Sequence, residues 1–156
     1  MSQLGNLITV QSDKDLHFTG AIAQNAEERE NIVLPQALGS ANFRRARSRL
    51  KALRIISVEN LAWEINLYGK DSFGSELDID LMGFIARWAF QAADGLQIAG
   101  AGPYLYYIDG LDIPYEDADA TGELHVSLVN RSAAGKSAAA AGNIVVAFIF
   151  DPLAAS

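Results

Sequence analysis

The clearest hydrophobic pattern lies between Gly122 and Pro152. From 123 to 128 apolar residues alternate with polar ones, which is typical of a strand with one buried face. From 144 to 150 every residue is apolar, and alternate residues point to one side, namely Ile144, Val146, Phe148 and Phe150. A strand that is apolar on both faces must be covered on both. The sequence therefore predicts that residues 144–150 lie in the middle of a packed sheet or against a partner chain.

The region from 53 to 121 reads as short strands separated by turns. Apolar residues occupy every second position of one run, namely Leu61, Trp63, Ile65 and Leu67. Strand-like runs also occur at 53–58, 104–108 and 111–115, and Asp109-Gly110 is a strong turn signal. Residues 84–93 fit either a strand or one short helix. About eight short strands without alternating amphipathic helices predict an all-β fold, an antiparallel β-sandwich with jelly-roll topology.

The first 42 residues have a different pattern from the rest of the chain. Short apolar pieces at 7–10, 16–18 and 32–34 are separated by polar stretches, and Pro35 and Gly39 follow. Such a segment is too broken to close a core of its own. We interpret residues 1–42 as an extended N-terminal arm with possible edge strands, and residues 43–156 as the sandwich domain. The alternative is that the arm supplies ordinary edge strands of the sandwich.

One stretch concentrates the positive charge. Six of the twelve Lys and Arg residues lie between 44 and 54, and four of them alternate with other residues, namely Arg45, Arg47, Arg49 and Lys51. On a strand these four share one face, with about 7 Å between neighbours. The row could bind an acidic partner surface or phosphates. It could equally be a solvated strand face that protects a sheet edge from aggregation.

Aromatic residues offer a second candidate for binding. The ones expected to be partly exposed are Tyr104, Tyr106, Tyr107, Tyr115 and Trp88. They could anchor a subunit interface, where aromatic side chains are enriched, or they could stack on sugars. Ordinary packing within the sandwich is the alternative. We take Tyr104 and Tyr106, together with the basic row, as the candidate partner-binding residues.

Composition narrows the classes of function. A chain of 156 residues has the length of one domain, and it contains no cysteine, which excludes disulfides and thiolate chemistry. The net charge of -7 argues against a general nucleic-acid binder. The longest apolar run is far shorter than the ~20 residues of a membrane-spanning helix. Because half of the residues are hydrophobic, burial of apolar surface between chains is plausible.

No catalytic or cofactor-binding motif stands out. The acidic residues near 109–119 could bind calcium or form a solvated loop, and they are Asp109, Asp112, Glu116, Asp117 and Asp119. The two histidines, His17 and His125, are too few for a histidine metal site, so we expect His125 to be at the surface or in a cross-strand hydrogen bond. Gly135-Lys-Ser137 lacks the preceding glycine and the long following helix of a P-loop. We expect no enzyme, no cofactor and no metal site.

The C-terminal third resembles a known group of proteins. It runs from Tyr107-Ile-Asp-Gly-Leu-Asp-Ile-Pro-Tyr-Glu-Asp117 through Gly122-Glu-Leu-His-Val-Ser-Leu-Val-Asn-Arg-Ser132 to a loop of small residues and a closing apolar strand. This arrangement resembles tailed-phage virion proteins, in particular small jelly-roll proteins that decorate or cement capsids.

The resemblance implies a non-enzymatic structural protein on the capsid surface, made in the host cytoplasm. It implies binding to the major capsid protein and to itself, as a homotrimer whose N-terminal arms reach neighbouring subunits. A carbohydrate-binding or receptor-binding β-sandwich module is the alternative. Neither function involves a membrane or nucleic acid, and no binding residues are transferred from the family.

Overall fold

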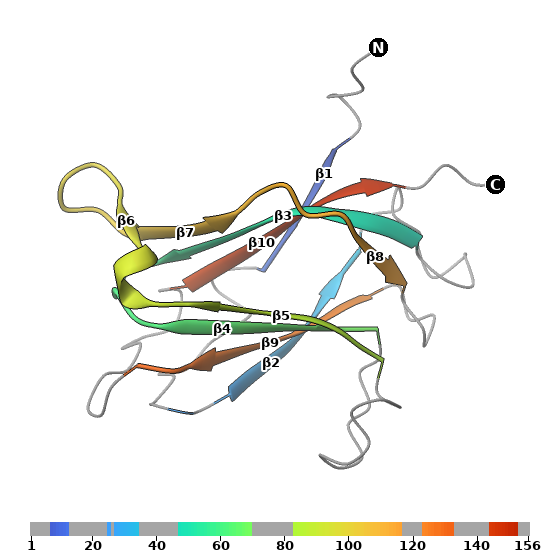
Figure 1. Ribbon diagram of the computed structural model, residues 1–156, viewed down its shortest axis with the longest axis horizontal. Helices are drawn as coiled ribbons and strands as arrows, with labels where there is room; N and C mark the ends of the chain where they lie inside the picture. The colour runs from blue at the N-terminus through green and yellow to red at the C-terminus, as the bar shows by residue number, and fades with distance from the viewer. Residues whose placement is uncertain are drawn as a thin grey trace.

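The computed structural model describes residues 7–12, 25, 27–34, 47–69, 83–116, 123–132 and 144–152. Within them, ten strands form two antiparallel sheets that lie one above the other (Figure 1). The first sheet contains β1 (Ile8–Gln11), β3 (Arg47–Ser57), β6 (Leu96–Gln97), β7 (Tyr104–Ile108), β8 (Ile113–Glu116) and β10 (Ile144–Pro152). The second contains β2 (Glu27–Val33), β4 (Trp63–Tyr68), β5 (Phe84–Phe90) and β9 (Glu123–Asn130).

The order of the strands confirms the predicted sandwich and its jelly-roll topology. The first sheet runs β1-β10-β3-β7-β6, with β8 also paired to β3, and the second runs β2-β9-β4-β5. Strands that follow one another in the chain therefore cross repeatedly from one sheet to the other, as in a jelly roll. Residues 84–90 form strand β5, and only a short 3-10 turn follows at Ala92–Asp94. In the described part of the chain, no helix has the length and hydrophobicity needed to cross a membrane.

Strand β10 lies in the middle of the first sheet, between β1 and β3, as its pattern predicts. The side chains at 144, 146, 148 and 150 are buried in the core between the sheets. The side chains at 145, 147 and 149 point to the opposite side of the sheet and are half-buried. The expected strand phase is therefore correct, and the second apolar face is only partly covered by this chain.

Strands β4 and β9 are buried on both faces, which the alternating pattern does not predict. Leu124 and Leu128 of β9 lie in the core, and His125 and Ser127 on its other face are also buried. His125 Nδ1 lies 2.8 Å from Oδ1 of Asn31 on the neighbouring strand β2. The expected cross-strand hydrogen bond is therefore present, whereas a surface position for His125 is wrong.

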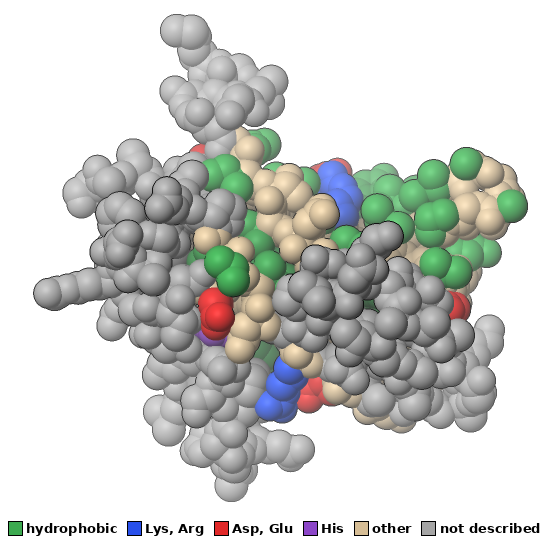
Figure 2. Space-filling model, turned by 180° about the vertical axis from the view of Figure 1, so that it is seen from behind, with side chains coloured by type: hydrophobic (Ala, Val, Ile, Leu, Met, Phe, Trp, Pro, Cys, Tyr) green, Lys and Arg blue, Asp and Glu red, His purple; other side chains and the backbone are tan. Residues whose placement is uncertain are grey.

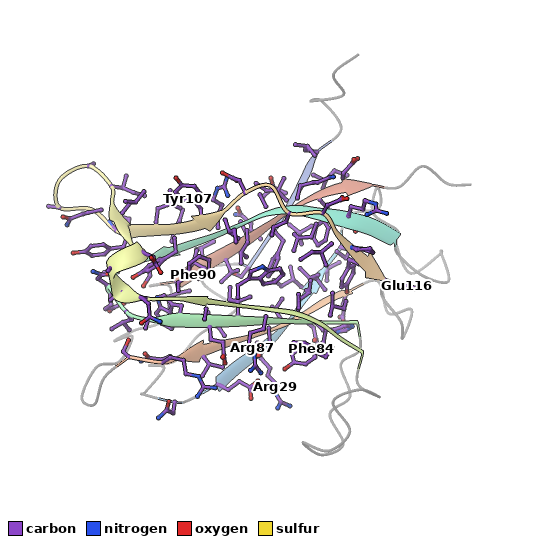
Figure 3. The ribbon with its side chains drawn as sticks, in the orientation of Figure 1. Arg29, Phe84, Arg87, Phe90, Tyr107 and Glu116 are labelled. Atoms are coloured by element: carbon purple, nitrogen blue, oxygen red, sulfur yellow. The ribbon has the colours of Figure 1, made fainter. Side chains whose placement is uncertain are left out.

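The outer side of the second sheet carries a network of paired polar side chains. Arg87 Nε donates to Asn66 Oδ1 over 2.6 Å, and Asn66 Nδ2 donates to Ser127 Oγ over 3.0 Å. Glu64 accepts a hydrogen bond from Arg131 over 3.0 Å and lies 3.6 Å from Arg87. Arg87 is on the lower side of this sheet in Figure 3. Because buried polar groups are costly without partners, this network makes the burial of β4 and β9 possible.

A β-bulge at Lys51 divides strand β3 into two halves. Leu50 pairs with Phe150, but Ala52 already pairs with Ile149, so Lys51 is the extra residue. Before the bulge, even-numbered side chains point into the core. After it, odd-numbered side chains do so, namely Leu53, Ile55 and Ser57. Strand β3 thus joins the described part of the basic stretch, from Arg47, to the apolar run that begins at Leu53.

The N-terminal region contributes strands to both sheets. Strand β1 pairs with β10 and strand β2 pairs with β9. Val10 and Ile32 are buried in the common core. Ser12 continues the pairing, because its amide donates to the carbonyl of Val146 and its hydroxyl accepts from the amide of Val146, both over 2.9 Å. The described parts of residues 1–42 therefore include one end strand of each sheet.

Candidate partner-binding surface

The side of the first sheet that points away from the second sheet is called the outer face here. Before the bulge it carries Arg49 and Lys51, which both contact Asp112 between β7 and β8. Arg49 Nη1 lies 3.3 Å from Asp112 Oδ2, and Lys51 Nζ donates to Asp112 Oδ1 over 2.8 Å. The hydrogen bond from Lys51 holds the pKa of Asp112 below its usual value. Two members of the predicted basic row therefore share one carboxylate of the same chain.

Arg54 continues the charged part of the outer face beyond the bulge. Its Nη2 lies 2.6 Å from Asp109 Oδ1, and its guanidinium carbon lies 5.2 Å from the centre of the Tyr107 ring. Asp109 and Asp112 come together because the chain turns sharply at Gly110, whose φ of 72° is rarely adopted by other residues. The turn predicted at Asp109-Gly110 thus places both acidic side chains over β3.

These contacts correct the expectation of a single-sign basic row. The side chains of Arg49, Lys51 and Arg54 face two carboxylates in ion pairs, and Asp151 lies opposite Arg49 in the register of β10 with β3. Three positive and three negative charges therefore balance at this part of the outer face. Ion pairs as exposed as these add little to stability. Their main effect is to neutralise the strand face, while the chain as a whole carries -7.

The predicted exposed aromatic residues divide into two groups. Tyr106 is 0% exposed and Tyr115 is also buried, so the expectation that they are accessible to a partner is wrong. Tyr104 and Trp88 are half-buried and pack against the core. Tyr107 is 47% exposed and projects from the outer side of β7 (Figure 3). The alternation along β7 explains the difference, because Tyr106 points to the core and Tyr107 away from it.

Burial of Tyr106 should make the stability of the protein depend on pH. Its hydroxyl donates to Asn60 Oδ1 over 2.6 Å, and desolvation raises the pKa of Tyr106 to about 12 from 10.0. In the unfolded chain this tyrosine loses its proton at a lower pH than in the folded protein. The contribution of Tyr106 to stability is therefore fully present below pH 10 and is lost as the pH rises towards 12. We expect urea unfolding to show this decline, and Tyr106→Phe to flatten it. Tyr107→Phe serves as the control, and an unchanged slope in Tyr106→Phe would contradict the assignment.

Beyond the charged part, the outer face is apolar. Four aliphatic residues from adjacent strands form a continuous row in register, in the order Val145, Ile56, Leu105 and Leu96. Ile56 is 40% exposed and Leu96 is 54% exposed. Val58 and Ile98 are exposed beside the row. This part of the outer face is called the apolar end, and Figure 2 shows hydrophobic side chains gathered there, around β6 and β7.

Several candidates from the sequence lie outside the described residues. They are His17, Arg45, Asp117, Asp119 and the segment Gly135–Ser137. Arg47 begins β3 and pairs in register with Glu116, but its side chain is not described. Of the acidic residues considered for calcium, Asp109 and Asp112 are engaged by cationic side chains. Among the described residues, no group of three or more metal-ligating side chains could hold an ion.

No protein-family model matches the chain, and no curated protein matches it. Among solved structures, a chain from the X-ray structure of Tomato aspermy virus is similar, with a TM-score of 0.47 and 10% sequence identity. The similarity covers 96% of this chain and 79% of that chain.

Proposed function

We propose that this protein is a non-enzymatic structural protein of a virion. In this proposal it decorates or cements a phage capsid by binding the major capsid protein and further copies of itself. The observation that carries the proposal is the outer face, which joins balanced ion pairs to an exposed apolar row on one rigid sheet. Exposed apolar patches with polar borders mark protein-binding surfaces.

Two further observations support a virion protein. The jelly roll is a fold of viral capsid domains, although lectins also use it, so the fold alone does not fix the function. Residues 107–132 carry the resemblance to phage decoration proteins. The proposal places the protein on the capsid surface after synthesis in the host cytoplasm. The resemblance implies a trimer, which stays a prediction.

The carbohydrate-binding alternative receives less support. A sugar platform needs an aromatic ring with an open face, and Tyr107 is the most exposed tyrosine of the described residues. One face of its ring is occupied by Arg54, which is itself held by Asp109. Tyr104 is half-buried and Tyr106 is fully buried. These positions favour a protein partner over a sugar.

The charged part of the outer face can be tested with two kinds of variant that should change binding to capsid shells in opposite directions. If Arg49 and Lys51 bind an acidic surface of the capsid protein, Asp112 competes with that surface for them. Replacing both cations by glutamine should weaken co-sedimentation with capsid shells about two- to fivefold. Asp112→Asn should strengthen it by a similar factor. Both effects should fade at high salt, because screening weakens exposed charges.

A matched control is available on the second sheet. Arg29→Gln removes a cation that is somewhat more exposed than Arg49 and Lys51, and its partner Glu27 lies 3.2 Å away on the same strand β2. This variant should bind shells as the parent does. If the Arg49 and Lys51 variant and the Asp112 variant also bind as the parent at every salt concentration, the charged part is only a solvated strand face. If the folded parent binds no shell but binds glycans on an array, the carbohydrate reading replaces the proposal.

A further inference from the structure

Exposed apolar side chains are concentrated at one place on this protein. Eight large hydrophobic residues are exposed among the described residues; four of them lie at the apolar end, namely Ile56, Val58, Leu96 and Ile98, and a fifth, Tyr107, lies beside it on β7. The other three lie singly: Leu7 precedes β1, Val33 ends β2 and Phe84 begins β5. Within the described surface, the apolar end is therefore the one cluster of large apolar side chains.

The shape of the apolar end suits packing against another sheet. Its central row crosses four neighbouring strands, β10, β3, β7 and β6, in direct register. With strands about 4.8 Å apart, the row extends over about 15 Å. The five exposed side chains offer on the order of 500 Å² of apolar surface, the size at which patches mark interaction sites. Two such faces can interdigitate with their backbones about 10 Å apart.

The charge distribution indicates what covers this end. The row from Val145 to Leu96 contains no charged residue, and the nearest ion pair, Arg54 with Asp109, is internally neutralised. A charged partner finds no unpaired charge in the row. Two copies of the chain carry -7 each and repel one another over most of their surfaces. The neutral outer face is where a second copy can approach without that repulsion.

We propose that two copies of this chain pack their apolar ends face to face around a two-fold axis near Ile56 and Leu105. In this contact the apolar end of one copy meets the apolar end of the other, which makes the contact isologous. The inference rests on the self-association in the proposed function and specifies its surface. Where a three-fold contact is also present, this two-fold contact joins two trimers.

Substitutions at the apolar end test the contact through sedimentation. Leu96→Asp places a carboxylate on each copy at an exposed edge strand, and it should raise the dissociation constant at least about 30-fold, as loss of a hot spot does. Ile56→Thr is the milder second variant. Val33→Asp is the matched control, because Val33 is 75% exposed on the other sheet. Raising the salt should strengthen association of the parent, because it screens the repulsion between copies.

Cross-linking tests the two-fold geometry. The chain has no cysteine, so Ile56→Cys carries a single thiol. Near a two-fold axis the two Cα atoms at position 56 lie about one sheet spacing of about 10 Å apart, which is too far for a disulfide but within reach of a short bis-maleimide. Ile56→Cys should give a covalent dimer at low micromolar concentration. Val33→Cys, the control, should remain single under the same conditions.

The outcomes separate this inference from the proposed function. A parent that sediments as a monomer at micromolar concentration, or equal cross-linking of both cysteine variants, overturns the two-fold contact. If Leu96→Asp loses binding to capsid shells while the parent is monomeric, the apolar end binds the capsid protein and the proposed function stands. If the parent pairs through this end but binds no shell, the contact stands and the virion proposal fails.

Discussion

Replacing Trp63 by alanine is expected to lower the free energy of unfolding by ~3–5 kcal/mol. Trp63 is fully buried on β4, where it is paired in register with Phe90 of β5 and with Asn130 of β9. Its indole nitrogen has no hydrogen-bond partner, so truncation breaks no polar contact of the side chain. The lost stability therefore comes from the apolar area that is no longer buried and from the cavity that the truncation leaves. It amounts to a large part of the 5–15 kcal/mol that stabilise a typical domain.

Urea unfolding of matched variants measures this effect. Phe148→Ala on β10 removes a second buried side chain, from the opposite sheet, and should cost a similar amount. Val33→Ala, at an exposed position, should change stability by less than about 0.5 kcal/mol. If both core variants unfolded within about 1 kcal/mol of the parent, their assigned direction into the core would be wrong.

Removal of residues 1–12 is expected to destabilise the sandwich by at least about 3 kcal/mol. The deletion takes away strand β1, so one side of β10 loses its hydrogen-bonding partner. It also takes away the buried side chain of Val10 and the two hydrogen bonds between Ser12 and Val146. An arm that served attachment alone would have no such effect on the folded body.

A shorter deletion provides the control. A chain that lacks residues 1–6 keeps β1 and should unfold as the parent does. Amide hydrogen exchange in β10 gives a local readout, because the amides of Val146 and Phe148 point towards β1 and their protection should fall when β1 is absent. A cooperative melt of the longer deletion at the parent temperature would show that β1 is dispensable and would restore the interpretation as an arm.

The sequence predicts which side chains of a strand face the core where its hydrophobic pattern allows only one arrangement. Residues 144–150 are apolar on both faces, which predicts a strand inside a sheet, and β10 does lie between β1 and β3, with its inner face buried and its outer face half-buried. The run from Leu61 to Leu67 alternates, and its apolar side chains indeed face the core. The jelly-roll topology followed from strand number and spacing. Burial of the outer sides of β4 and β9 could not be predicted, because it depends on what packs against them.

The surface depends on contacts that no local pattern encodes. Lys51 and Asp112 are 61 residues apart, and their pairing requires the register of β3 with the turn at Gly110. For this reason the row of cations in the sequence predicts a strand face with unpaired positive charges, and the carboxylates that pair with it are not predicted. The bulge at Lys51 is equally invisible, although it decides that Ile56, rather than Ile55, joins the outer face. One inserted residue thus places cationic and aliphatic side chains on the same side of one strand.

The position of β10 between β1 and β3 also dictates when the protein can fold. During synthesis, β1 and β3 leave the ribosome long before residues 144–152, yet the strand that separates them is β10. Contacts so distant in sequence close slowly, and domains fold as units. A nascent chain that ends before residue 144 leaves the edges of β1 and β3 that pair with β10 without hydrogen-bonding partners, which favours aggregation and degradation. Only chains that include β10 can complete the sandwich, so incomplete translation products are kept out of the folded population without a separate checking step.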